Sequence, residues 1–210
     1  MHFGENDSAD ALTMRMMVNM IISDGPNLVV ITGDICSCSF RSTEATVFGS
    51  AYAKLRNVFD ILERNSKGTP FVWVPGASDF ESFDGTYEYF KDYAEKNKWD
   101  MTQYNTFKWE QKKLFHPFTF DLKIPTMDSS DTALRIYMFG TGRFDCLGMG
   151  GNDCIRRDAI EWFRQESKNI PEDNIYRQNG IAFMHYPLHE HMQMVDSLPV
   201  HGQRRDYTGC

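Results

Sequence analysis

Hydrophobic positions along the chain form three patterns: a helical period, short continuous apolar runs, and runs in which apolar and polar residues alternate. The helical period predicts helices over residues 9–22, 45–64, 87–98 and 157–166. Continuous apolar runs predict buried strands over residues 28–31, 71–74 and 181–184, and alternating runs predict strands of a half-exposed sheet over 118–124 and 134–139. Strands therefore alternate with helices, which predicts an α/β protein whose sheet is at least partly parallel.

Polar residues follow each of the three predicted buried strands. Gly33-Asp34 follows the first strand, Gly76 to Asp79 follows the second, and His185-Tyr186-Pro187 follows the third. Ligands of such sheets bind outside the carboxyl ends of the strands. Asp34 and His185 can therefore converge on one place, and a carboxylate with an imidazole is a typical donor set for Mn, Fe or Zn.

Size and charge narrow the choice of function. The chain has 210 residues, so we expect one domain over residues 1–210, and its formal net charge is −7. That acidity argues against a nucleic-acid-binding or polybasic membrane surface. No apolar run is long enough for a membrane span, and the polar start MHFGENDSAD is unlike a signal peptide, so we expect a cytoplasmic protein. Five cysteines, an odd number, are expected to be free thiols.

Five segments in order along the chain resemble motif blocks of the calcineurin-like metallophosphoesterases. Asp24–Asp34 resembles the block that delivers a metal-bridging Gly-Asp, and His2–Gly4 resembles the end of the preceding Asp-x-His-x-Gly block. Phe71–Asp79 stands where the family has a strand followed by Gly-Asn-His-Asp. Phe183–Glu190 resembles a block of the purple-acid-phosphatase-like branch, and Ala159–Phe163 resembles the helix before that block.

The resemblance implies a fold and a reaction. The fold would be a metallophosphoesterase-type β-sandwich flanked by helices, here without the first strand and without the last motif-bearing strand. The reaction would be metal-dependent hydrolysis of a phosphoester by a phosphatase with a pair of Mn, Fe or Zn ions. The sequence does not identify which phosphoester is the substrate.

The resemblance also implies the residues of the site. Asp34 would bridge the two metal ions, His2 would bind one of them and His185 the other. Ser78 occupies the position of the catalytic histidine that protonates or stabilises the leaving oxygen. Asp79 is either a replacement carboxylate ligand or a cap of the following turn or helix.

Departures from the family pattern leave other interpretations open. Ala77 replaces the asparagine ligand and has no donor atom, so we expect impaired activity. The alternatives are a catalytically inactive phosphoesterase-fold module that binds or regulates, and a truncated gene product. A sheet that lacks strands has exposed edges, so self-association is also expected.

Two other local patterns do not carry a site of their own. His189-Glu190-His191 lacks the spacing of a zinc-binding His-Glu-x-x-His helix, and we interpret it as a solvated loop. The glycines between residues 140 and 151 do not match a phosphate-binding loop, and we interpret them as turns.

Overall fold

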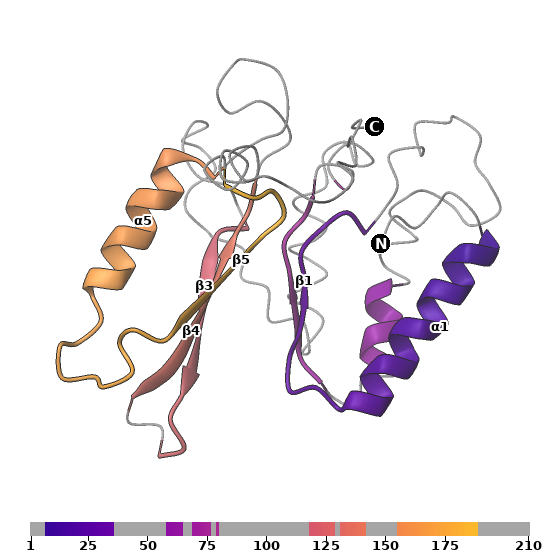
Figure 1. The fold of residues 1–210 in the computed structure, drawn as a ribbon, viewed down its shortest axis with the longest axis horizontal. Helices are drawn as coiled ribbons and strands as arrows, with labels where there is room; N and C mark the ends of the chain where they lie inside the picture. The colour runs from indigo at the N-terminus through magenta and orange to yellow at the C-terminus, as the bar shows by residue number, and fades with distance from the viewer. Residues whose placement is uncertain are drawn as a thin grey trace, which may run out of the picture.

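The structure is a computed structural model that describes residues 7–35, 58–64, 69–76, 79, 118–128, 131–141 and 155–188. In chain order, the elements are α1 (Asp7–Asp24), β1 (Val29–Ile31), β2 (Phe71–Trp73), β3 (Phe120–Pro125), β4 (Thr132–Phe139), α5 (Arg157–Lys168) and β5 (Gly180–Met184). Residues 58–64 are also helical. Figure 1 shows how these elements are arranged.

The predicted element types agree with the structure wherever the structure describes them. The predicted burial of the strand over residues 181–184 is wrong: β5 is exposed from Gly180 to Ala182, because it is an edge strand of its described sheet. The helices predicted over residues 9–22 and 157–166 correspond to α1 and α5, and the five predicted strands correspond to β1 to β5. The helix predicted over residues 45–64 is confirmed for residues 58–64. The helix predicted over residues 87–98 lies outside the described residues.

The described strands form two sheets. β1 pairs with β2 in parallel, with Val30 opposite Val72. The second sheet has the order β3-β4-β5, in which β3 and β4 are antiparallel and β4 and β5 are parallel. Both parallel pairs bring carboxyl ends of neighbouring strands to one edge. The predicted mixed α/β class with partly parallel pairing is therefore confirmed.

The two sheets lie between helices. In Figure 1, α5 lies beyond the β3-β4-β5 sheet and α1 lies on the other side, beyond the β1-β2 sheet. One cluster of buried residues includes members of both sheets, among them Ile31, Phe71, Trp73, Phe120, Leu122, Ile136 and Met138. The aromatic rings of Phe59, Trp73 and Phe118 pack in this cluster at centroid distances of 5.2–5.3 Å. The arrangement is consistent with the expected fold, in which helices flank two packed sheets.

The prediction that residues 134–139 form a half-exposed strand is wrong. From Arg135 to Phe139 every residue of β4 is buried. The reason is that β4 is the central strand of its sheet and has packing on both faces. Ile136 and Met138 belong to the core shared by the two sheets, whereas Tyr137 and Phe139 pack in a second cluster with Ala159 of α5.

Helix α1 carries apolar residues on more than one face. Its inner residues Met14, Met17 and Ile21 contact the core. Its residues Leu12, Met16 and Met20 are 57–60% exposed. The predicted helix is thus confirmed, but the apolar residues that suggested it are largely those on its outer face. No helix in the described ranges is both long enough and apolar enough to cross a membrane.

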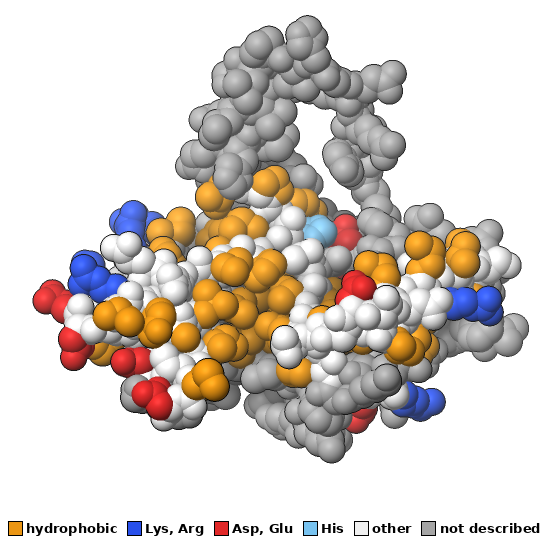
Figure 2. All heavy atoms as spheres, turned by 60° about the horizontal axis from the view of Figure 1, so that its bottom comes forward, with side chains coloured by type: hydrophobic (Ala, Val, Ile, Leu, Met, Phe, Trp, Pro, Cys, Tyr) orange, Lys and Arg blue, Asp and Glu red, His pale blue; other side chains and the backbone are white. Residues whose placement is uncertain are grey.

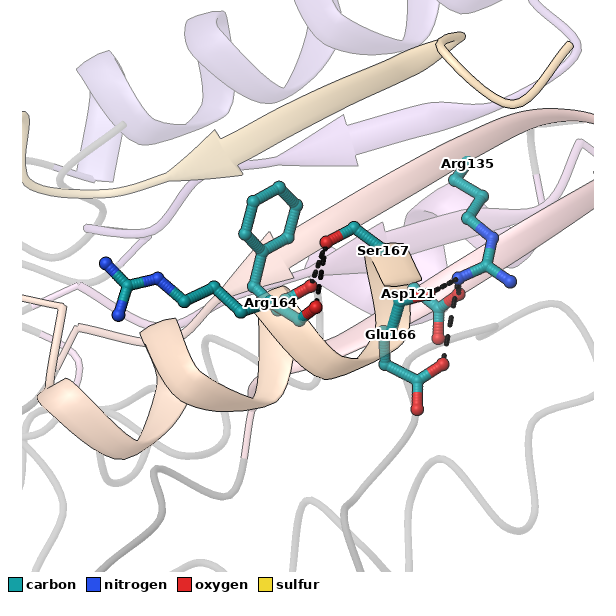
Figure 3. A network of polar contacts seen from close by, with 6 residues as sticks. Asp121, Arg135, Arg164, Glu166 and Ser167 are labelled. Carbon is teal, nitrogen blue, oxygen red and sulfur yellow. Dashed lines mark hydrogen bonds and ion pairs between the residues drawn. The ribbon is translucent and has the colours of Figure 1, made fainter. Parts of the chain in front are cut away.

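A buried arginine connects α5 to its sheet (Figure 3). Arg135 on β4 donates a hydrogen bond from Nη1 to the backbone oxygen of Glu166 in the last turn of α5, at 3.1 Å. The same nitrogen lies 3.6 Å from Oδ2 of Asp121 and 3.7 Å from Oε2 of Glu166. The cation therefore compensates two carboxylates and the negative end of the helix dipole.

Replacement of Arg135 by Met should lower the free energy of unfolding by about 2–4 kcal/mol, because two partly buried carboxylates lose their cation. Arg157→Met is the matched control. Arg157 pairs with Glu161 at 3.1 Å, but its side chain is 92% exposed, so its loss should cost less than about 1 kcal/mol. Urea unfolding of both variants measures the difference. Equal losses would contradict this role of Arg135.

Candidate metal centre

The loop after β1 has an unusual backbone. Gly33 has a φ of 95° and Asp34 has a φ of 50°, so two consecutive residues lie in the left-handed region. Aspartate adopts this region more readily than most residues, but the conformation still costs free energy. Such strained residues occur mainly at functional sites. The loop turns sharply after Ile31 and directs the Asp34 carboxylate toward the loop that follows β5.

The loop after β5 places His185 against the loop after β1. Nδ1 of His185 lies 2.8 Å from the backbone oxygen of Thr32. Because a carbonyl oxygen only accepts hydrogen bonds, Nδ1 is the protonated donor. Nε2 of His185 then lies 3.3 Å from Oδ1 of Asp34. The hydrogen bond to Thr32 thus fixes the ring orientation and presents Nε2 to the carboxylate.

Two glycines allow these loops to meet. A Cβ on Gly33 would come within 2.8 Å of the Cα of Gly76 and 2.9 Å of Nδ1 of His185. A Cβ on Gly76 would collide with the Asp34 carboxylate and would lie 2.7 Å from Cε1 of His185. Gly76 follows β2, so the loops after β1, β2 and β5 touch at one place. The predicted convergence of Asp34 and His185 is confirmed.

Asp79 is buried where the loops after β1 and β2 meet, and it is only 1% exposed. Oδ1 accepts a hydrogen bond from the backbone N–H of Ile35 and Oδ2 accepts one from the N–H of Gly76, both at 2.9 Å. One carboxylate therefore connects the loops after β1 and β2.

Asp34 and His185 fit two ligand positions of one metal ion. Protein nitrogen and oxygen ligands lie about 2.0–2.2 Å from Zn²⁺, so two ligands on one ion are about 3–3.5 Å apart at angles of 90–110°. The observed 3.3 Å between Oδ1 and Nε2 falls within that spacing. A metal-binding histidine usually donates a hydrogen bond from its other ring nitrogen, and here Nδ1 donates to the carbonyl of Thr32.

The other predicted site residues are not all placed. His2, Ala77 and Ser78 lie outside the described residues, as do His189 and His191. In the described part of the chain, no three His, Cys, Asp or Glu side chains form a ligand cluster. Ligation by His2, Asp34, His185 or Asp79 therefore stays a prediction.

Sequence reasoning missed two parts of this arrangement. The first is the backbone carbonyl of Thr32, which accepts the hydrogen bond from His185. A backbone group leaves no trace in the residue types, and only the turn residues that follow Thr32 hint at it. The contact of Asp79 with Ile35 spans 44 residues, so no local pattern could show it.

The charge of His185 depends on its acidic neighbours. Burial lowers the pKa of His185, but the hydrogen bond to Asp34 and its charge, the contact with Thr32 and the charge of Asp79 together raise it above the ordinary histidine value of 6.5. Because the folded pKa is the higher one, the contact stabilises the fold fully below about pH 6.5 and this contribution is lost as pH rises through the folded pKa.

Replacement of Asp34 by Asn should lower the pKa of His185 in the metal-free protein, because the negative charge beside Nε2 is removed. NMR titration of the His185 ring, assigned with His185→Gln, measures the change. Asp173→Asn, which alters an exposed carboxylate in another loop, is the control and should leave the pKa unchanged. An unchanged or higher pKa in Asp34→Asn would contradict the described contact.

Comparison with protein families gives one match. Residues 1–206 match the family described as Metallophos, Calcineurin-like phosphoesterase. No curated protein and no solved structure matches the chain significantly.

Proposed function

Because the chain belongs to the calcineurin-like phosphoesterase family, we propose that it binds a pair of metal ions and hydrolyses a phosphoester at the ends of β1, β2 and β5. The family is a class of phosphoester hydrolases that typically bind two metal ions. The observation that carries the proposal for this chain is the approach of Asp34 Oδ1 to His185 Nε2 at 3.3 Å. Carboxylate and imidazole donors suit Mn, Fe and Zn.

Each residue of the proposed site has its own task. Asp34 supplies the bridging carboxylate, His2 binds one metal ion and His185 binds the other. Bound ions would orient the phosphoester and activate a water molecule. The hydrogen bond from His185 Nδ1 to Thr32 keeps the proton off Nε2 once the ring is neutral, so Nε2 can act as a ligand.

We further propose that the chain is similar to the purple-acid-phosphatase-like branch and that its activity is low. The block Phe183–Glu190 supports the branch. Ala77 has no donor atom where the family has an asparagine ligand, and Ser78 replaces the histidine that assists the leaving group. Loss of general acid–base assistance alone slows a reaction by about 10²–10⁴-fold. The same substitutions favour the alternative of an inactive phosphoesterase-fold module that binds or regulates.

Self-association through sheet edges is part of the proposal. Strand β5 is an edge strand of its described sheet, and its residues from Gly180 to Ala182 are exposed. Ile181 is apolar and 48% exposed. Figure 2 shows apolar side chains gathered over the middle of one face of the molecule. Such an edge can pair with a second copy of the chain.

Incubation with Mn²⁺, Fe²⁺ or Zn²⁺ followed by desalting should leave about two metal equivalents per chain, in line with dinuclear sites. Metal content by mass spectrometry measures this, and hydrolysis of p-nitrophenyl phosphate measures the reaction. Asp34→Ala and His185→Ala should each reduce both readouts, whereas Asp173→Ala, in an exposed loop, should reduce neither. Retention near zero in folded wild-type protein would overturn the proposal.

Restoration of the family residues should raise activity. The double variant Ala77→Asn, Ser78→His regains a donor atom and a proton donor, so its kcat on p-nitrophenyl phosphate should exceed that of the wild type by at least about tenfold. The single variant Ala77→Asn should increase metal affinity alone. If neither changes, the loop after β2 does not face the reacting groups as proposed.

A further inference from the structure

Asp79 makes two hydrogen bonds that connect separate parts of the candidate metal centre. Its Oδ1 accepts from the N–H of Ile35, the residue after Asp34, and its Oδ2 accepts from the N–H of Gly76. Gly76 is the residue whose Cα faces both the Asp34 carboxylate and the His185 ring. A displacement of either N–H would therefore shift the Asp34 carboxylate relative to the His185 ring.

We propose that Asp79 is a positioning residue: its two oxygens hold the loop after β1 against the loop after β2 and thereby keep Asp34 facing His185. The inference rests on the proposed function, because the groups that it positions are those assigned to the metal ions. It differs from a role of Asp79 as a replacement ligand, since both oxygens are occupied by backbone hydrogen bonds that join the two loops.

Burial explains why a carboxylate is suited to this task. Asp79 is 1% exposed, so its charge has little contact with water. A buried carboxylate needs donors, and two backbone N–H groups supply strong charge-assisted hydrogen bonds. The N–H groups benefit in turn, because a buried N–H without an acceptor is unfavourable. The pair of bonds thus holds a left-handed Asp34 that would otherwise relax toward more common backbone angles.

Asp79→Asn tests the arrangement with little change in size. The amide oxygen can accept one of the two hydrogen bonds, but the amide nitrogen is a donor and cannot accept the other. Asp79→Glu is a second variant that keeps the charge, while its extra methylene prevents both bonds from forming at the present geometry. If Asp79→Asn does not fold, Asp79→Glu carries the test.

Asn174→Ala is the matched control. Asn174 is also buried and also holds a loop, since its Nδ2 donates to the backbone oxygen of Thr132 and its Oδ1 accepts from the N–H of Tyr176. Thr132 begins β4, whereas Phe139 at the other end of β4 pairs with Met184, the residue before His185. The control therefore removes a comparable buried contact at the opposite end of the sheet.

The experiment combines three readouts on the full chain. Amide hydrogen exchange reports on the N–H groups of Ile35 and Gly76, the nuclear Overhauser effect reports on the contact between the Gly76 Hα and the His185 ring, and calorimetry gives the dissociation constant of Mn²⁺. In Asp79→Asn, exchange at one or both amides should accelerate at least about tenfold, the Overhauser effect should weaken, and Mn²⁺ should bind about 10–100-fold more weakly. Asn174→Ala should leave all three near wild type even where it lowers the unfolding midpoint equally.

Each contrary result has a distinct meaning. Wild-type Mn²⁺ affinity in Asp79→Asn would overturn the positioning role. Weaker Mn²⁺ binding with unchanged amide exchange and an unchanged Overhauser effect would also overturn it, because Asp79 would then be a ligand. If wild-type protein binds no Mn²⁺, the proposed function fails. The positioning of Asp34 is then decided by the exchange and Overhauser readouts, which require no metal: unchanged values in the variant would overturn it.

Discussion

The contact between His185 and the carbonyl of Thr32 is the constraint on which the candidate site depends. It joins the end of β5 to the end of β1 at 2.8 Å, and these strands belong to different described sheets. Without it, two sheets could share a core and still leave their carboxyl ends apart. The same hydrogen bond fixes the proton on Nδ1 and directs Nε2 toward Asp34. One short contact thus sets both the spacing of the strand ends and the chemistry of the ring.

Charge and backbone geometry act together at this place. Gly33 and Gly76 permit an approach that any Cβ would obstruct, and the buried Asp79 carboxylate joins the two loops by its hydrogen bonds. The resulting arrangement places two carboxylates near one imidazole, which raises the pKa of His185 despite its burial. A site that attracts a proton in this way suits a metal cation as well, because both are stabilised by the same anionic neighbours.

The sequence predicts the helices and strands of this fold better than it predicts their burial and their contacts with one another. Short apolar runs indicated β1, β2 and β5. Only β2 is buried throughout, whereas β5 is exposed from Gly180 to Ala182, so the apolar run predicted the strand but not its burial. Burial of β4 on both faces was not predicted, since it follows from α5 and the β1-β2 sheet packing on opposite sides of β4. Asp34 and His185 were predicted to meet on the expectation that their strands end at the same edge of one sheet. They do meet, although β1 and β5 belong to different described sheets. The hydrogen bond between Asp79 and Ile35 and the one between Arg135 and Glu166 could not be predicted, because they join residues 44 and 31 positions apart that no motif connects.

The central claim is that Asp34 and His185 bind the same metal centre. Its most direct test is an anomalous difference map from crystals of the full chain grown with Mn²⁺. The account predicts a strong peak within about 2.0–2.4 Å of both Oδ1 of Asp34 and Nε2 of His185, or a pair of peaks that Asp34 bridges. A map with no peak at this place at saturating Mn²⁺, or with the ion bound elsewhere while the direct contact between Asp34 and His185 persists, would contradict it.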